Sequence, residues 1–150
     1  MTPLIITRNV QRKLVAETEE LILPSRIESV DEAAMHAESF IKGHGLGDEV
    51  LSAVDLAVRE SVANAVKHGN KFDAEKMVEI TFVLSPKGVE IKVRDFGPGF
   101  DPTSLPDPTD PANLLKATGR GILFMRTFMD EVEWSTHAGG GMVVKMIKSQ

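Results

Sequence analysis

The feature that most constrains the fold is a pair of short hairpins in the second half of the chain. Residues 77–84 and 89–94 alternate apolar and polar side chains and are joined by a Ser-Pro-Lys-Gly turn. A second pair, residues 131–135 and 142–147, flanks a run of glycines. Alternation with period two predicts strands, and connections this short allow only antiparallel pairing. The sequence therefore predicts a sheet that is mainly antiparallel.

The other segments predict helices that cover this sheet. Residues 13–23 alternate and end at Pro24, which predicts an edge strand, whereas residues 29–42, 48–68 and 119–128 have apolar positions at helical spacing. Strands and helices do not alternate along the chain as a doubly wound parallel sheet requires. We therefore expect an α+β two-layer sandwich, with helices on one face of a mixed, mainly antiparallel sheet.

Length and composition limit the classes of function. A chain of 150 residues fits one domain, residues 1–150, and a net charge of -5 gives no general electrostatic reason for nucleic-acid binding. The absence of cysteine excludes disulfides, thiolate zinc sites and cysteine nucleophiles. No apolar run approaches the roughly 20 residues that span a bilayer. We expect a cytoplasmic protein that binds neither membrane nor nucleic acid directly.

Three polar residues follow one another along the second predicted helix. Glu60, Asn64 and His68 are spaced by four residues, which places their side chains in one row. The amide oxygen of Asn64 suits Mg²⁺, and the Glu60 carboxylate could accept a proton or orient water. The alternative is a solvated polar stripe, but the rest of this helix is too apolar to be freely exposed. The row is expected to line a cavity.

A second motif ends the strand 89–94. Asp95 is followed by Gly97 and Gly99, which permit a backbone path that larger residues would block. A carboxylate in this place could accept a hydrogen bond from an exocyclic amine such as that of adenine. The alternative is an ordinary Asp/Gly/Pro turn. The Pro-, Asp- and Gly-rich segment that follows, residues 95–116, is predicted to contain a lid.

A third motif opens the predicted helix 119–128. Gly119 and Gly121 come just before an amphipathic segment and would leave backbone N–H groups free at the positive end of its dipole, where phosphates bind. Arg120 adds a charged donor. The motif is not GxxxxGK[ST], so it predicts no P-loop, and it does not match the GxGxxG of dinucleotide-binding folds. The alternative is a simple helix start.

Two apolar features are assigned to packing. Trp134 lies in a predicted strand and is expected to pack rather than to stack on a base. Phenylalanine and methionine residues at helical spacing in 124–129 are expected to be core rather than a cofactor site.

In this order, the three motifs resemble the N, G1 and G2 boxes of the GHKL ATPase superfamily, over about residues 48–148. The segment LAVRESVANAVKHGN, residues 56–70, looks like the N box of anti-sigma-factor serine/threonine kinases. GRGILFMRTFMDEV, residues 119–132, looks like their G2 box and the helix after it. The resemblance implies the Bergerat ATP-binding fold, with the whole chain as one HATPase-like kinase domain.

The resemblance also implies roles for the motif residues. Glu60 would be the general base on the acceptor hydroxyl, and Asn64 would ligate a Mg²⁺ ion that bridges the phosphates. Asp95 would bind the adenine amine, with Gly97 and Gly99 shaping the pocket. ATP or ADP and Mg²⁺ are thus the implied ligands.

The phosphates would meet the third motif. Gly119, Arg120 and Gly121 would contact them, and His68 would help to position groups on the phosphate side. Some family members carry an arginine two positions before the first glycine, where this chain has Ala117. That departure bears on the kinase step more than on nucleotide binding.

Partners are likewise implied by the resemblance. The acceptor would be a serine or threonine of an anti-anti-sigma (STAS-like) protein, the kinase would also sequester a sigma factor, and the domain would form a homodimer. Three alternatives are a switch that binds ATP or ADP without catalysis, a histidine-kinase-like catalytic domain, and a metal hydrolase that uses His68. The last is disfavoured because neither HxxxH nor HExxH occurs.

Overall fold

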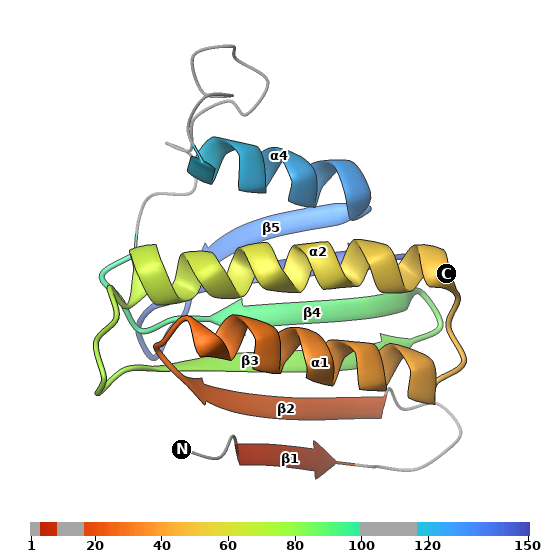
Figure 1. Ribbon diagram of the computed structural model, residues 1–150, viewed down its shortest axis with the longest axis horizontal. Helices are drawn as coiled ribbons and strands as arrows, with labels where there is room; N and C mark the ends of the chain where they lie inside the picture. Colours follow the sequence, from red (N-terminus) through yellow and green to blue (C-terminus); the bar gives the residue numbers. More distant parts are fainter. Residues whose placement is uncertain (1–3, 9–16, 100–116) are drawn as a thin grey trace.

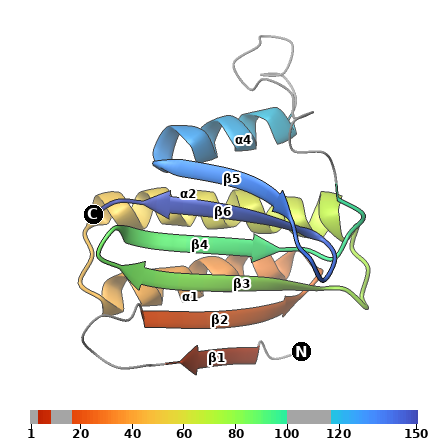
Figure 2. The same cartoon turned by 180° about the vertical axis from the view of Figure 1, so that it is seen from behind.

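The computed structural model describes residues 4–8, 17–99 and 117–150, which form helices over one face of a six-stranded sheet (Figure 1). The strands are β1 (Leu4–Arg8), β2 (Glu17–Pro24), β3 (Met77–Ser85), β4 (Gly88–Arg94), β5 (Glu131–Thr136) and β6 (Met142–Lys148). They lie in the order β1-β2-β3-β4-β6-β5, and each of these pairings is antiparallel (Figure 2). The predicted α+β class and both predicted hairpins are confirmed.

The prediction of an edge strand before Pro24 is wrong. β2 pairs on one side with β3 and on the other with β1, which itself forms the edge of the sheet. The connection between β1 and β2 contains no turn motif, so the local sequence pattern does not predict the pairing of Leu4 with Ile22. Residues 13–16 of the predicted strand lie outside the described residues.

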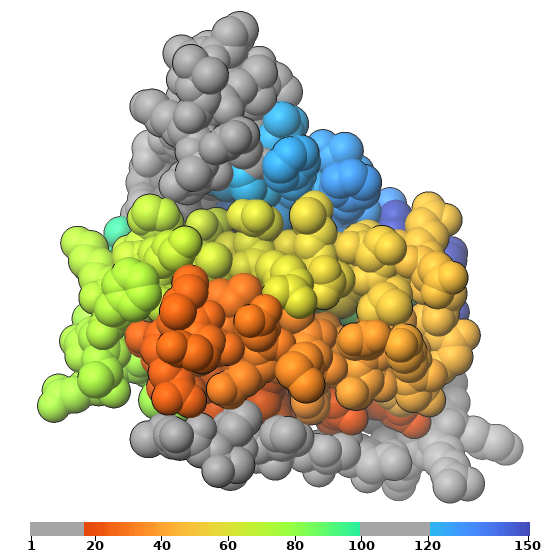
Figure 3. Space-filling model, viewed as in Figure 1, coloured from red at the N-terminus to blue at the C-terminus, as the bar shows by residue number. Residues whose placement is uncertain are grey.

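Three helices of the described residues make the second layer. α1 (Glu28–Gly43) and α2 (Asp48–Asn64) lie side by side across the sheet, and α4 (Ala117–Phe128) packs against α2 near β5. In the space-filling view, α1 and α2 cover the middle of this face (Figure 3). Figure 2 shows the opposite face of the sheet without helices.

The second helix differs from the prediction at its end. The α-helix stops at Asn64, and a π-helical turn, η1 (Ala65–Gly69), replaces the predicted continuation to His68. The N–H of Asn70 donates to the carbonyl oxygen of Ala65 at 2.8 Å, five residues earlier. Such wide turns often occur at functional sites.

The core lies between the layers and follows both periodicities. Val78, Ile80 and Phe82 of β3 point toward the helices and are fully buried, as are Val54 and Val62 of α2. Each such side chain stabilises the fold by roughly 1.5–3 kcal/mol through removal of apolar surface from water. Met125 of α4 and Met129, just after it, join the same core. The predicted packing role is confirmed for these two methionines and is wrong for Phe124 and Phe128, which are exposed.

The predicted lid falls mainly outside the described part of the chain. Residues 95–99 are described, and residues 100–116 are not. Helix α4 begins at Ala117, two residues earlier than predicted.

Candidate nucleotide site

A cavity of about 440 Å³ lies between the end of α2, the end of β4 and the start of α4. Its floor is apolar and includes Val93, Ile122 and Met125. Polar groups lie around this floor, as is typical of sites for small organic ligands. The full lining is Ser61, Asn64, Ala65, His68, Gly69, Lys71, Val93, Asp95, Pro98, Gly99, Ile122, Met125, Trp134, Met142 and Val144.

Residues from two of the predicted motifs meet in this cavity. Asn64 and His68 line it from α2 and η1, and Asp95 and Gly99 line it from the segment after β4. Ile122, the residue after Gly121, lines it from α4. Three segments distant in sequence therefore share one hollow, as a nucleotide site made from these motifs requires.

Glu60 does not line the cavity together with Asn64 and His68, as the predicted row required. It is not among the lining residues, and its carboxylate lies against the backbone of Gly121, where an added Cβ would overlap Oε2. The glycine of α4 thus leaves room for the end of the Glu60 side chain of α2. The contact places a carboxylate at the start of α4, beside the cavity rather than in it.

Gly97 is buried rather than exposed to the cavity. A Cβ there would overlap the carbonyl oxygen of Gly69, and a Cβ on Gly69 would overlap the carboxylate of Asp95. The turn after α2 and the loop after β4 therefore interlock through two glycines. This close approach fixes the wall of the cavity next to Asp95.

Gly119 and Arg120 lie in the first turn of α4 rather than ahead of it. The first four N–H groups of a helix have no partner within the helix, so the backbone donors at residues 117–120 lie at the positive end of the helix dipole. The structure describes the backbone of Arg120 but not its side chain. The phosphate-binding prediction thus concerns the first turn of α4 itself.

Asp95 is half-buried and held by backbone donors. Its Oδ1 accepts hydrogen bonds from the N–H groups of Gly97 at 2.9 Å and Met142 at 3.5 Å. Burial raises the pKa of the Asp95 carboxyl above its ordinary value, and these two N–H groups and Lys76 offset part of that rise. With Oδ1 bound in this way, the second oxygen, Oδ2, lies toward Gly69 at the cavity wall.

Several residues that line or support the cavity were not predicted as site residues from the sequence. Trp134 packs against the core as predicted, but it also lines the cavity, as do Met142 and Val144 on β6. Their position follows from period-two alternation, which directs these side chains to the helical layer. Asn70 is a further case, because it is 2% exposed and bonds to three chain segments.

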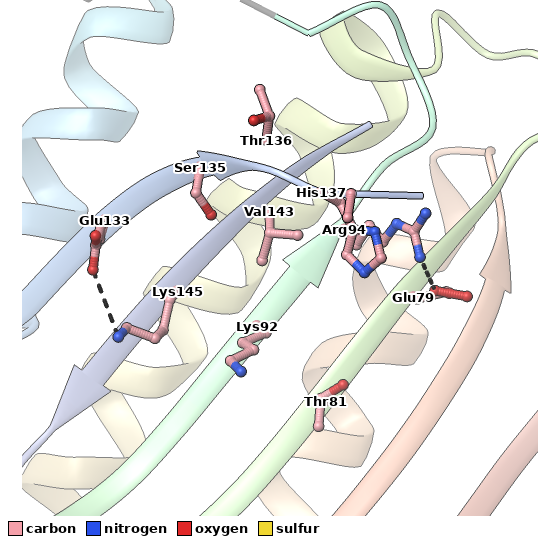
Figure 4. Close-up of a pocket in the computed structure, with 11 residues that line it drawn as sticks. Glu79, Thr81, Lys92, Arg94, Glu133, Ser135, Thr136, His137, Val143 and Lys145 are labelled. Atoms are coloured by element: carbon pink, nitrogen blue, oxygen red, sulfur yellow. Dashed lines mark ion pairs between the residues drawn. The ribbon is translucent and has the colours of Figure 1, made fainter. Parts of the chain in front are cut away.

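A second hollow, of about 470 Å³, lies on the helix-free face of the sheet (Figure 4). Four of its charged side chains form two ion pairs: Arg94 with Glu79, and Lys145 with Glu133, each at 3.5 Å. A polar, solvated face is what an antiparallel sheet with helices on one side presents. Although slightly larger, this hollow contains none of the predicted motif residues.

Two further searches concern the described residues only. No group of three or more His, Asp or Glu side chains in them is arranged to hold a metal ion. None of the described helices combines the length and apolar character needed to cross a bilayer.

Comparisons with known proteins agree with this geometry. Residues 23–148 match the family model of the histidine kinase-like ATPase domain. The chain belongs to this family. It is 32% identical over 120 residues to an anti-sigma F factor of Bacillus cereus, with 77% of this chain and 81% of that protein covered. A serine-protein kinase RsbW of Listeria monocytogenes is 24% identical over 130 residues, with 83% of each chain covered.

A solved structure supports the fold of this family member. The RsbU and RsbW domains of a Mycobacterium tuberculosis protein match it with a TM-score of 0.62 and 18% identity. The match covers 99% of this chain and 32% of that longer one. The resemblance to GHKL ATPases, and within them to anti-sigma-factor kinases, is thereby confirmed.

Proposed function

We propose that this member of the histidine kinase-like ATPase family binds ATP with Mg²⁺ in the cavity and phosphorylates a serine or threonine of an anti-anti-sigma (STAS-like) protein. It would also sequester a sigma factor. Its relatives are an anti-sigma F factor and a serine-protein kinase, and the chain is accordingly a protein serine/threonine kinase. The observation that carries the proposal is that Asn64 and Asp95 line one cavity beside the first turn of α4.

The base end of the nucleotide is assigned to Asp95. Its Oδ2 would accept a hydrogen bond from the exocyclic amine of adenine. Gly99 would keep a side chain away from the ring, and Gly97 would shape the pocket through its close approach to Gly69. The apolar floor, with Met125 and Val93, suits a flat heterocycle.

The phosphate end is assigned to α4 and to Asn64. Gly119, Arg120 and Gly121 would meet the phosphates at the start of the helix, where the dipole favours negative charge. His68 lines the same cavity and would position groups there. Bound Mg²⁺ would neutralise charge on the phosphates. A single protein oxygen, from Asn64, fits this ion because Mg²⁺ in phosphate sites usually keeps water and phosphate oxygens as its other ligands.

Glu60 is proposed to take the proton of the acceptor hydroxyl. Phosphoryl transfer depends mainly on positioning and on charge stabilisation, so the base needs only to stand beside the bound phosphates. Its carboxylate lies against Gly121 at the start of α4, next to where the phosphates are proposed to bind.

The decisive test compares Glu60→Gln with the wild type. The variant should lose transfer by about 10²–10⁴-fold, the usual contribution of a general base, and should keep its affinity for ATP. Transfer is measured with labelled ATP, Mg²⁺ and candidate STAS-like partners, followed by phosphosite mapping. Glu49→Gln, an exposed change in the first turn of α2, is the matched control. Unchanged transfer in Glu60→Gln would remove Glu60 from the mechanism.

A non-catalytic switch is the second candidate, favoured by the absence of Glu60 from the cavity lining and by Ala117 where some relatives carry arginine. In that case the wild type would transfer no phosphate, and Glu60→Gln would release its partner on ATP binding as the wild type does.

A histidine-kinase catalytic domain is a weaker candidate. His36 of α1 lies partly buried beside β2, with Nε2 2.8 Å from a carboxylate oxygen of Glu19. It is not presented for phosphorylation. Phosphotransfer to a response regulator would nevertheless identify that class.

A further inference from the structure

We infer that Asn70 is a positioning residue: it fixes the backbone that carries Asp95, and through Asp95 it makes the cavity select adenine by its 6-amino group. This inference rests on the proposed function, because it assumes that Asp95 accepts a hydrogen bond from the base. Asn70 itself does not line the cavity.

The side chain of Asn70 connects three segments. Its Nδ2 donates to the hydroxyl of Ser25 at 2.8 Å and to the carbonyl oxygen of Met77 at 3.0 Å. Its Oδ1 accepts a hydrogen bond from the N–H of Phe96 at 2.8 Å. Ser25, directly after β2, in turn donates to the carbonyl oxygen of Lys76. Both ends of the Asn70 amide are therefore used inside the protein.

The bond to Phe96 acts directly on the loop that orients Asp95. Phe96 follows Asp95, and the next N–H, that of Gly97, donates to Oδ1 of Asp95. The N–H of Phe96 is thus bound to Asn70, and the N–H of Gly97 is bound to the carboxylate of Asp95. A loss of the first bond would let the loop shift and turn Oδ2 away from the base.

The residue type is restricted by this set of partners. Two acceptors and one donor face a side chain that is 2% exposed, and a primary amide supplies two donors and an acceptor. Apolar residues would leave the N–H of Phe96 and the carbonyl oxygen of Met77 without a partner.

A purely structural role is the competing explanation. Asn70 precedes Lys71 and Phe72, which have φ of 52° and 58°, and its backbone carbonyl accepts from the N–H of Asp73 at 3.0 Å. If Asn70 only stabilised this strained turn, its substitution would lower the stability of the fold and would change the affinity for all nucleotides equally. Selectivity between bases separates the two roles.

The test measures the affinity of ATP and of purine riboside triphosphate, which lacks the 6-amino group. The wild type should prefer ATP by about tenfold or more, the factor that one hydrogen bond to a charged group provides. Asn70→Ala should lower the affinity for ATP to that for the analogue and change the analogue's affinity by less than about twofold. Asn70→Asp, which keeps an oxygen for the N–H of Phe96, should restore part of the preference.

Ser25→Ala is the matched control, because it removes the Ser25 bonds and leaves the bond between Asn70 and Phe96. It should keep the preference for ATP. If Asn70→Ala keeps the preference, or loses affinity for both nucleotides alike, the inference is overturned while the proposed function stands. If the wild type shows no preference, the assignment of Asp95 fails and the inference fails with it.

A measurement on the wild type does not depend on whether the variants fold. The N–H of Phe96 should exchange with solvent as slowly as those of β4, although it lies beyond the strand. Rapid exchange at Phe96 would overturn the inference by itself.

Discussion

The ionised carboxylate of Asp95 is proposed to stabilise the bound nucleotide, but its burial lowers the free energy of unfolding of the protein. Burial disfavours its ionised form, so its pKa is raised in the folded chain. Stability gained from the protonated carboxyl is therefore present below the unfolded pKa and is lost as pH rises through the raised folded pKa. The amide in Asp95→Asn has no charge to bury.

Asp95→Asn should consequently bind ATP about 10-fold or more weakly and unfold at a higher denaturant concentration at pH 7 than the wild type does. The stability difference should shrink as pH falls through the raised folded pKa of Asp95 and should be constant below its unfolded pKa. Calorimetric titration and urea unfolding at several pH values would check this, with exposed Asp73→Asn as control. A variant that is equally stable at every pH would contradict the assigned desolvation.

At Gly121, a substitution by alanine should affect the position of Glu60 and the stability of the fold in different ways. A Cβ there would meet the end of the flexible Glu60 side chain, which can rotate away. Alanine also favours a helix by roughly 0.5–1 kcal/mol over glycine. Gly121→Ala should thus keep or slightly raise the melting temperature, while phosphate transfer falls at least about tenfold because the base is displaced.

Gly43→Ala is the comparison for that variant, because a Cβ at Gly43 would meet nothing within 4 Å. Transfer kinetics and melting curves of both variants decide the matter. If ATP affinity in Gly121→Ala falls as much as transfer does, the added Cβ acts on phosphate binding rather than on the position of Glu60.

At the scale of elements, Arg94 ties the β5–β6 turn to the end of β4. Its Nε and Nη2 donate to the carbonyl oxygen of Gly140 at 3.2 and 2.9 Å, and its guanidinium carbon lies 4.2 Å from the centre of the Phe96 ring. Two residues beyond Gly140, Met142 donates to Asp95. The turn is thus connected to the nucleotide cavity from the helix-free face of the sheet.

Arg94→Met should speed amide exchange in residues 139–142 and lower stability by about 1 kcal/mol, since partly exposed hydrogen bonds contribute modestly. Exchange measured by mass spectrometry or NMR tests this. Arg94→Lys, which keeps the charge but not the paired donors, should behave almost like Arg94→Met. Unchanged exchange in both variants would show that the turn is held by other contacts.

At the scale of the whole molecule, binding should be visible as stability. ATP with Mg²⁺ at 100 times its Kd should stabilise the fold by about 2.7 kcal/mol, which corresponds to a rise of about 5–10 °C for a domain of this size. ADP should also raise the melting temperature, and GTP should do so much less. Asp95→Asn should respond weakly to each nucleotide. A shift with GTP equal to that with ATP would contradict recognition of the adenine amine.

Local patterns in the amino-acid sequence determine much of this protein. Period-two alternation and short turns predict both hairpins, helical spacing predicts three helices, and the three motifs indicate the family. These features depend on residues close in sequence, which is why they could be predicted. The pairing of β1 with β2 could not, because it joins residues 4 and 22 through a segment without a turn motif.

Only the tertiary structure decided how the motifs meet. Asn64 and His68 line the cavity, whereas Glu60, one turn earlier on α2, contacts Gly121 of α4. The bond from Phe96 to Asn70 spans 26 residues. Contacts of this kind arise when packed elements bring distant backbone groups within hydrogen-bonding distance, and neither periodicity nor motif spacing contains that information.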